Sequence, residues 1–155
     1  MSISITLPAE YGYVLATATG TFILSTWHGM RVGPFRKAAN IPYPTQYASD
    51  SVIASTTDST KKHNMYLFNC AQRAHYNFLE NYVSFLPALL ISGLRFPVAS
   101  SVLGAAWIVF RAMYATGYTR ADRKDGKGRV IGSGFWLAQF ALYGMCGTMA
   151  WKMIV

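Results

Sequence analysis

Four long apolar runs constrain this chain more than any other feature of its sequence. They cover approximately residues 11–30, 73–94, 98–118 and 130–151. A helix needs about 20 predominantly apolar residues to cross the hydrocarbon core of a bilayer, and each run has about that length. A helix also satisfies its own backbone hydrogen bonds inside the hydrocarbon. The sequence therefore predicts an all-α integral membrane protein, built as a four-helix bundle.

The composition supports a membrane protein and argues against a nucleic-acid binder. Of the 155 residues, 52% are hydrophobic and 13% are charged, whereas an ordinary soluble domain has about 25% charged residues. The formal net charge is +8, but no aromatic and basic surface motif accompanies it. Basic loops beside a membrane explain this charge more simply. We interpret residues 1–155 as a single transmembrane domain with no nucleic-acid partner.

The two cysteines do not form a recognisable motif. Cys70 and Cys146 fall in different predicted helices, and no C-x-x-C spacing is present. A zinc site or a disulfide framework is therefore not predicted, and we expect both residues to be small buried side chains.

The loops between the apolar runs are strongly asymmetric in charge. Ten basic residues fall in two loops, approximately residues 31–72 and 119–129, whereas only Arg95 and Lys152 flank the spans on the other side. The ten are Arg31, Arg36, Lys37, Lys61, Lys62, Arg120, Arg123, Lys124, Lys127 and Arg129. Because cytosolic loops are enriched in Lys and Arg, the sequence predicts that both loops are cytosolic. The two termini would then lie in the lumen or outside the cell.

The connections also differ in length and composition. The link Arg95–Pro97 is so short that the second and third spans must be antiparallel neighbours. The middle of the first loop, TQYASDSVIASTTDSTKK at residues 45–62, is rich in Ser and Thr and is typical of a flexible surface excursion. No internal repeat is visible, so a transporter built from inverted repeats has no support.

Three polar residues share one face of the second span. Arg73, Asn77 and Glu80 follow an i, i+4, i+7 spacing, and they extend over roughly 10 Å of helix. A glutamate that faces lipid costs about 2.5–3.5 kcal/mol, so Glu80 should face a partner, a polar cavity or a ligand. A tripeptide has a similar length, so this face could hold a small peptide-like anion. Arg73 would bind a ligand carboxylate and Glu80 a ligand ammonium. The alternative is an internal Arg–Glu pair that only fixes helix packing.

A second polar face is predicted on the third span. Arg111, Tyr114 and Tyr118 follow an i, i+3, i+7 spacing. Tyr118 and Arg73 both lie at the cytosolic ends of the second and third spans, which are antiparallel neighbours. Arg111 is deeper and should pair internally. Tyrosine is also common at membrane interfaces without any further function.

The loop TRADRKDGKGR follows the third span directly. Its Lys and Arg residues could bind lipid headgroups or only satisfy the orientation rule for cytosolic loops. They could also stabilise an anion at the mouth of a site between spans two and three. Arg129 is best placed to reach inward, and Arg36 and Lys37 lie at the same predicted depth. The candidate functional groups therefore cluster at the cytosolic boundary of the bundle.

Three segments of the chain resemble a known family. The runs EYGYVLATA, FNCAQRAHYNFLE and WIVFRAMYATGY are similar to the type-3 branch of the microsomal glutathione transferases. These belong to the membrane-associated proteins in eicosanoid and glutathione metabolism, abbreviated MAPEG. The resemblance covers nearly the whole chain except the Ser- and Thr-rich part of the first loop.

The resemblance implies a homotrimer in the endoplasmic reticulum membrane that binds glutathione between adjacent subunits and uses no metal. The implied glutathione contacts are Arg73, Asn77, Glu80, Tyr114 and Tyr118, with Arg36 or Lys37 as the basic residue after the first helix. An arginine near the start of the fourth helix would hold the thiolate. Arg129 fits this role, and Arg123 and Lys127 are the alternatives because the loop lengths differ.

The resemblance also implies a reaction. A glutathione thiolate would be conjugated to a lipophilic electrophile or would reduce a lipid hydroperoxide that arrives from the membrane lipid. A non-catalytic, lipid-binding membrane scaffold of the same fold is the alternative. A channel is disfavoured, because the fourth span offers only Gln139 and small residues for a polar stripe.

Overall fold

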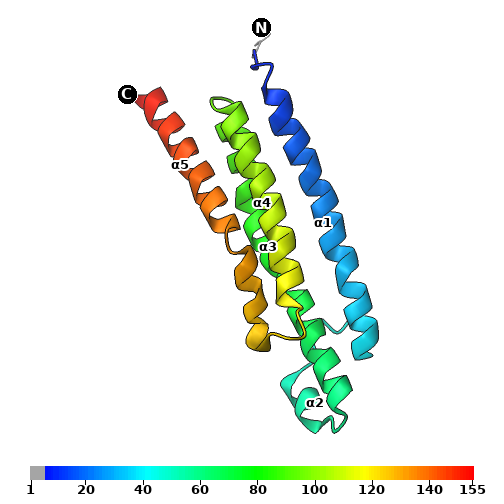
Figure 1. Cartoon of the computed structure of the whole chain (residues 1–155). Helices are drawn as coiled ribbons and strands as arrows, with labels where there is room; N and C mark the ends of the chain where they lie inside the picture. Colours follow the sequence, from blue (N-terminus) through cyan, green and yellow to red (C-terminus); the bar gives the residue numbers. More distant parts are fainter. Residues whose placement is uncertain (1–5) are drawn as a thin grey trace.

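The computed structural model describes residues 6–155 as a bundle of long helices (Figure 1). The long helices are α1 (Tyr11–Ala39), α3 (Ser59–Gly93), α4 (Pro97–Tyr118) and α5 (Phe135–Ile154). The connections contain the short helix α2 (Asp50–Ser55) and the 3₁₀ segment η1 (Lys124–Gly132). Residues 6–155 contain no strand. The predicted all-α class is therefore confirmed.

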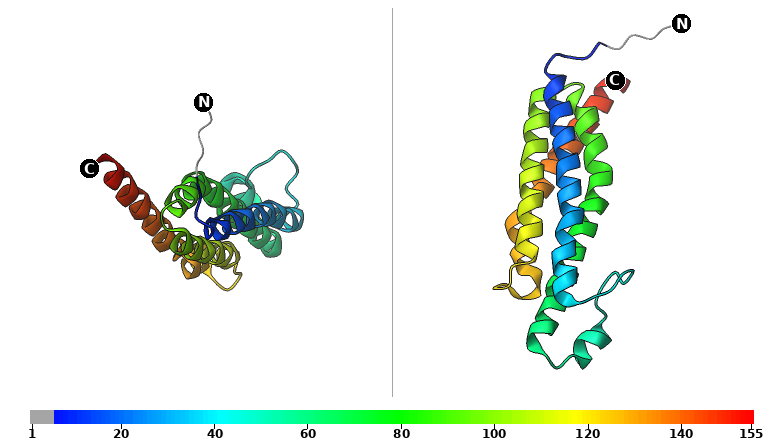
Figure 2. Two further views of the ribbon diagram at one scale, coloured as in Figure 1. Left: turned by 90° about the horizontal axis from the view of Figure 1, so that it is seen from above. Right: turned by 90° about the vertical axis from the view of Figure 1, so that its right-hand side faces the viewer.

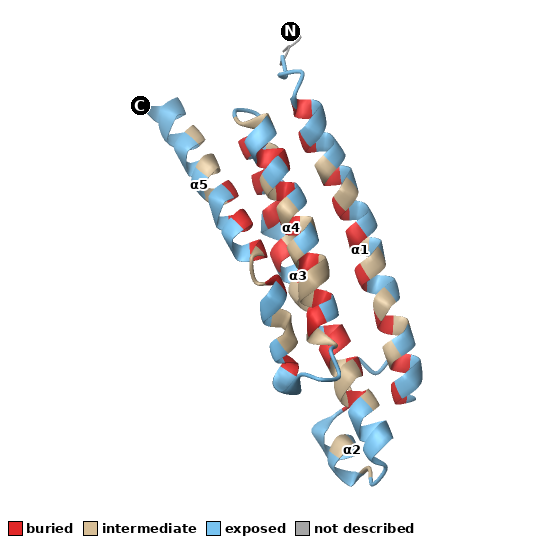
Figure 3. Ribbon diagram, viewed as in Figure 1, coloured by how far each residue is buried: buried red, intermediate tan, exposed pale blue. Residues whose placement is uncertain are grey.

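The helices α3 and α4 form the centre of the bundle. They pack against each other, and each also packs against α1 and α5, which lie on opposite sides of them (Figure 2). The core between them is rich in aromatic rings. Trp107 is fully buried and stacks on Phe85 with 3.8 Å between ring centroids, while Phe78 and Phe135 lie against it. Figure 3 shows the buried residues as stripes along the inner faces of the helices.

The two ends of the bundle differ in charge. The start of α1, the end of α5 and the tight turn between α3 and α4 lie at one end, whereas α2 and η1 lie at the other (Figure 1). Arg95 and Lys152 are at the first end, where they line a common pocket. We call the other end, which carries residues 31–72 and 119–129, the basic end. The two basic loops thus lie at the same end of the bundle, as predicted, while their orientation in a membrane stays a prediction.

The helices extend much further into the basic end than the apolar runs indicated. The first helix continues past Met30 to Ala39, and α3 begins at Ser59 rather than near Arg73. The Asp58 carboxylate caps α3 by accepting hydrogen bonds from the backbone N–H groups of Thr60 and Lys61, at 2.8 and 3.2 Å. Polar helical turns of this kind lie outside the apolar pattern, so hydropathy does not reveal them.

The interpretation of residues 45–62 as a flexible excursion is wrong. This segment folds into α2 and the start of α3 and is held by two amide side chains of α3. Asn69 exchanges two hydrogen bonds with the backbone of Ala48, at 2.8 and 2.9 Å. Gln72 donates to the carbonyl of Gln46 at 2.7 Å. These contacts satisfy the loop backbone, and a small cluster of Val32, Ala39, Ala48, Met65 and Phe68 is buried beneath it.

The fourth predicted span is broken at its start. Instead of one helix over residues 130–151, η1 ends at Gly132, α5 begins at Phe135, and the two are bent by 47°. The break brings Gly132 against the backbone of Tyr114 in α4, where a side chain would overlap main-chain atoms. Close approach of two backbones therefore sets the position of the bend.

Length and composition identify fewer membrane-spanning helices than four. Within residues 6–155, α4 alone is long and apolar enough, and η1 with α5 qualifies as a bent pair. The first helix contains many Gly, Ala and Thr residues, and α3 contains Arg73, Asn77 and Glu80 within its apolar run. The four-span arrangement therefore stays a prediction, although the bundle itself has four long helices.

Replacing Gly132 by alanine should destabilise the junction between η1 and α5. The added Cβ would lie 2.5 Å from the Phe110 carbonyl oxygen and would overlap the Tyr114 backbone, so the two chains must move apart. We expect a loss of about 1–3 kcal/mol, measured as a lower unfolding temperature in detergent. Gly144→Ala is the matched control, because nothing lies within 4 Å of its Cβ. Equal stability of the two variants would contradict the close packing.

Candidate functional site

The three polar residues predicted to share a face of α3 do lie together. The Arg73 guanidinium donates to both carboxylate oxygens of Glu80, at 2.8 and 3.2 Å. The Asn77 amide donates to the same carboxylate at 3.5 Å. The side chains of Arg73 and Glu80 are 46% and 51% exposed. An exposed ion pair contributes only about 0–1 kcal/mol, so both charged groups remain available to a ligand.

Arg111 approaches this polar face from the core. It is fully buried, and its Nη1 donates to Asn77 Oδ1 at 2.8 Å. Its guanidinium carbon lies 4.3 Å from the ring centroid of Phe135 and 5.0 Å from that of Tyr114. The expectation that Arg111 pairs internally is confirmed, but its partner is an amide rather than an acid. Arg111 thereby fixes the direction in which the Asn77 carbonyl points.

The tyrosines of α4 meet the predicted thiolate-binding arginine. Tyr114 and Tyr118 are in edge-to-face contact, with ring centroids 5.6 Å apart. The guanidinium carbon of Arg129 lies 5.2 Å from the Tyr118 ring centroid, and its Nη1 donates to the carbonyl of Asp125 at 3.0 Å. The structure therefore brings Arg129 to the α4 face that carries both tyrosines.

The two alternative basic residues of the same loop have other partners. Arg123 lies 3.6 Å from the carboxylate of Asp122, and Lys127 lies 3.6 Å from that of Asp125. Their side chains are 59% and 74% exposed. Of the three candidates, Arg129 is the one whose guanidinium contacts Tyr118.

The Arg36 guanidinium is held by loop carbonyls and aromatic rings. Its Nη1 donates to the carbonyl of Thr45 at 2.6 Å and to that of Pro42 at 3.4 Å. Its guanidinium lies between the rings of Tyr43 and Phe68, at 4.3 and 4.7 Å. Arg36 therefore holds the loop after α1, and these contacts do not bring it to Arg73. The sequence grouped the two by depth alone, which does not fix the direction of a side chain.

A polar network between α3 and α5 was missed by the sequence analysis. Gln139 is buried; its Oε1 accepts from Trp107 Nε1 at 2.9 Å. Its Nε2 donates to the Tyr143 hydroxyl at 2.5 Å and to Ser84 Oγ at 3.3 Å. Ser84 lies one turn beyond Glu80 on α3, so the network continues the polar face. The i, i+4 pairs Glu80–Ser84 and Gln139–Tyr143 were the available signal.

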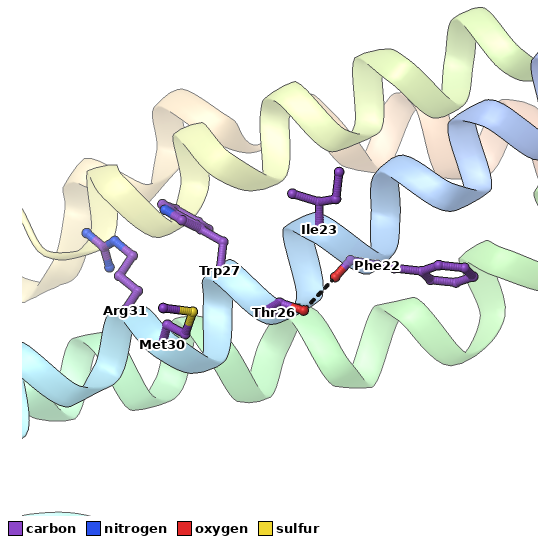
Figure 4. A pocket seen from close by; sticks show the side chains of 6 residues that line it. All are labelled: Phe22, Ile23, Thr26, Trp27, Met30 and Arg31. Atoms are coloured by element: carbon purple, nitrogen blue, oxygen red, sulfur yellow. Dashed lines mark hydrogen bonds between the residues drawn. The ribbon is translucent and has the colours of Figure 1, made fainter.

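A separate apolar groove of about 600 Å³ runs along α1. Figure 4 shows the six side chains that line it. They are Phe22, Ile23, Thr26, Trp27, Met30 and Arg31. The groove is shallow and open, since all six residues come from α1, and Arg31 borders it toward the basic end. The Arg31 guanidinium lies 5.5 Å from the Trp27 ring centroid and donates to the Thr119 hydroxyl. None of these residues belongs to the polar face of α3, so the groove and that face are distinct features of the chain.

The fold and this site define a helical bundle in which α3 carries a charged, exposed face. No group of three potential metal ligands occurs within the described range 6–155. The model of the MAPEG family matches residues 14–148, which include nearly all of the bundle. The chain belongs to the MAPEG family, whose members are membrane proteins and include glutathione transferases.

A curated relative adds no activity to this assignment. The uncharacterized protein sll1147 of Synechocystis sp. is 39% identical to the chain over 67 residues. The aligned segment covers 43% of this chain and 49% of that relative. The match thus spans about half the length of the relative.

Asn77→Ala should destabilise the bundle because it leaves the buried Arg111 charge without its amide partner. The Arg111 Nε and Nη2 atoms already have no partner among the described residues, so no other acceptor replaces the lost one. We expect a loss of about 3 kcal/mol, measured by thermal unfolding in detergent. Adding Arg111→Met should recover much of this loss, because it removes the stranded charge. A double variant as unstable as Asn77→Ala would contradict the pairing.

Proposed function

We propose that this protein is a membrane-bound glutathione transferase and peroxidase of the type-3 branch. The observation that carries the proposal is the exposed Arg73–Glu80 pair with Asn77 beside it, on a helix of a MAPEG protein. The proposed glutathione contacts are Arg73, Asn77, Glu80, Tyr114 and Tyr118. Arg36, whose guanidinium donates to a loop carbonyl, and Lys37 stay the two candidates for the basic residue after α1.

The charges of this face are complementary to those of glutathione. Glutathione has two carboxylates, one ammonium and one thiol, and an arginine fork binds a carboxylate through two parallel hydrogen bonds. A ligand that offers a carboxylate to Arg73 and an ammonium to Glu80 replaces each partner with one of the same charge. The exchange costs little because the side chains of the existing pair are about half exposed.

The chemical step requires a thiolate. An unperturbed thiol has a pKa near 8.5, and a neighbouring guanidinium lowers it; Arg129 is the group proposed for this role. The thiolate then attacks an electrophilic carbon, forms a thioether and releases the leaving group. With a hydroperoxide the thiolate attacks the terminal oxygen and breaks the O–O bond, which gives glutathione sulfenic acid and, after protonation of the leaving alkoxide, an alcohol. A second glutathione thiol then attacks the sulfenic sulfur, forms the disulfide and releases water.

The proposed assembly is a homotrimer with its basic end in the cytosol, in the endoplasmic reticulum membrane. Arg73 and Glu80 point away from the core of their own subunit, which suits a site that an adjacent subunit completes. The surface of α5 also exposes large apolar side chains, including Leu137 at 77% and Phe140 at 57%. Lipid and neighbouring subunits are both suitable partners for such a surface.

The groove on α1 favours a second candidate function, a non-catalytic lipid-binding scaffold. Its lining is mostly apolar, and the Arg31 cation lies at one end. This arrangement suits an acyl chain with an anionic head. If the protein is an enzyme, the same groove would bind the lipophilic co-substrate. Turnover therefore distinguishes the enzyme from the scaffold.

Arg129→Ala should abolish most turnover while leaving glutathione binding nearly unchanged. Loss of the guanidinium raises the pKa of the bound thiol, whereas the carboxylate and ammonium contacts remain. We expect kcat to fall by about 100-fold or more, measured with a small aryl halide and with a fatty-acid hydroperoxide. Arg123→Ala and Lys127→Ala are the matched controls from the same loop. If the wild-type protein binds fatty acids but turns over neither substrate, the scaffold function replaces the enzyme.

Arg73→Ala should weaken glutathione binding. The variant loses a charge-assisted contact to a ligand carboxylate, which contributes about 1.5–3 kcal/mol, or roughly a 10- to 150-fold higher Kd. Isothermal titration calorimetry of the detergent-solubilised protein measures the change. Arg95→Ala, at the opposite end of the bundle, should leave the Kd unaltered. Equal affinities of wild type and Arg73→Ala would remove α3 from the proposed site.

A further inference from the structure

One hydrogen bond ties the loop after α4 to the extended part of α3. The backbone N–H of Gly126 donates to the Tyr66 hydroxyl at 2.6 Å. Tyr66 lies two turns before Arg73, in the part of α3 that projects beyond the predicted span. Gly126 is buried, and the bond joins residues that are 60 positions apart in the chain. It therefore holds two separate elements of the basic end together.

The turn at this contact has an unfavourable backbone. Asp125 and Gly126 are both left-handed, with φ of 58° and 60°. This region costs most non-glycine residues roughly 1 kcal/mol or more, although Asp adopts it more readily than most, so contacts with neighbouring elements help to hold Asp125 there. The turn is also pressed against α4, because a Cβ on Gly126 would lie 2.5 Å from the Tyr118 ring.

Arg129 is held by the same peptide unit. Its Nη1 donates to the carbonyl of Asp125 at 3.0 Å, and the N–H of that peptide is the Gly126 N–H bound by Tyr66. A peptide unit is planar, so the direction of its N–H fixes the direction of its C=O. In a trans peptide the two groups point to opposite edges of that plane. The Tyr66 hydroxyl at one edge thus determines where the acceptor for Arg129 lies at the other.

We propose that Tyr66 is a positioning residue for Arg129, acting through the Asp125–Gly126 peptide. Its hydroxyl fixes the left-handed turn, and the turn holds the Arg129 guanidinium against the ring of Tyr118. The importance of this contact for catalysis rests on the proposed function, whereas the contact itself does not. No substrate group needs to touch Tyr66.

The hydroxyl keeps its role over the pH range in which a thiol ionises. Burial, followed by a contact with the Cys70 thiol, raises the pKa of Tyr66 above its ordinary value of 10. The phenol therefore stays protonated at neutral and mildly alkaline pH. A change in the pH–rate profile of a Tyr66 variant consequently reports on the glutathione thiol rather than on Tyr66.

The first experiment compares Tyr66→Phe with wild type in turnover. We expect kcat at neutral pH to fall roughly tenfold, with the KM for glutathione changed less than twofold. The loss should shrink as the pH rises, because an Arg129 out of place leaves a thiol of higher pKa that still ionises in alkali. The double variant Tyr66→Phe/Arg129→Ala should be no slower than Arg129→Ala alone, since the first change acts through the second residue.

Two further variants keep the test specific. Gly126→Ala pushes the turn away from Tyr118 by a different route and should give the same shift of the pH–rate profile. Tyr13→Phe is the control, because Tyr13 is 62% exposed on α1. The proposal would be overturned if the losses of kcat from Tyr66→Phe and Arg129→Ala added up in the double variant. It would also be overturned if the pH–rate profile moved in neither Tyr66→Phe nor Gly126→Ala.

A second readout does not depend on turnover. The loop contains Lys124, Lys127 and Arg129, so limited trypsin digestion of the folded protein reports how firmly it is held. Tyr66→Phe should raise the cleavage rate roughly two- to tenfold, as expected for the loss of one hydrogen bond. Unchanged cleavage would show that the bond does not hold the turn. If wild type shows no turnover at all, the proposed function fails, and this cleavage rate alone decides whether the contact exists.

Discussion

The arrangement of the two central helices depends on the contacts of the buried Arg111 guanidinium. Removing such a cation from water costs several kcal/mol unless it is compensated. Here the compensation is one amide oxygen of α3 and a surround of aromatic faces from α3, α4 and α5. Cation–π contacts gain strength when they are desolvated. The register between α3 and α4 is therefore set by a charge rather than by apolar packing alone.

This internal charge has a consequence at the surface. Because Arg111 takes the Asn77 oxygen, the Asn77 amide nitrogen turns toward Glu80, which in turn pairs with Arg73. One polar network thus runs from the centre of the bundle to its exposed face. Its exposed end carries separable charges of both signs, whereas its buried end is fixed by packing. A site built in this way combines a rigid base with groups that are free to exchange partners.

The sequence predicted those features that depend on helical spacing. Arg73, Asn77 and Glu80 are neighbours because residues three, four and seven positions apart share a face, and Tyr114 and Tyr118 follow the same rule. Arg129 was favoured by its place at the start of the fourth helix. The depth of a residue along the bundle, however, said nothing about its direction, and for that reason Arg36 was grouped with residues that it does not contact.

The missed features all depend on contacts between distant parts of the chain. Asn69 and Gln72 order a loop that lies 21 and 26 positions earlier, although Ser- and Thr-rich composition indicates flexibility. Gln139 was weighed only as a channel residue, since its partners in α3 and α4 cannot be read from spacing within one helix. The contact between Tyr66 and Gly126 crosses an even longer interval and ends on a backbone group.

The exposed face of α3 also bears on assembly. A glutamate that faced hydrocarbon would cost about 2.5–3.5 kcal/mol, and in the single chain about half of the Glu80 side chain is exposed. Glu80 is paired with Arg73, but the ion pair as a whole still lies at the surface. A membrane protein lowers this cost by placing such a pair against water, a polar ligand or another subunit. The proposed glutathione site between subunits would provide all three, so the charged face and the proposed trimer follow from the same requirement.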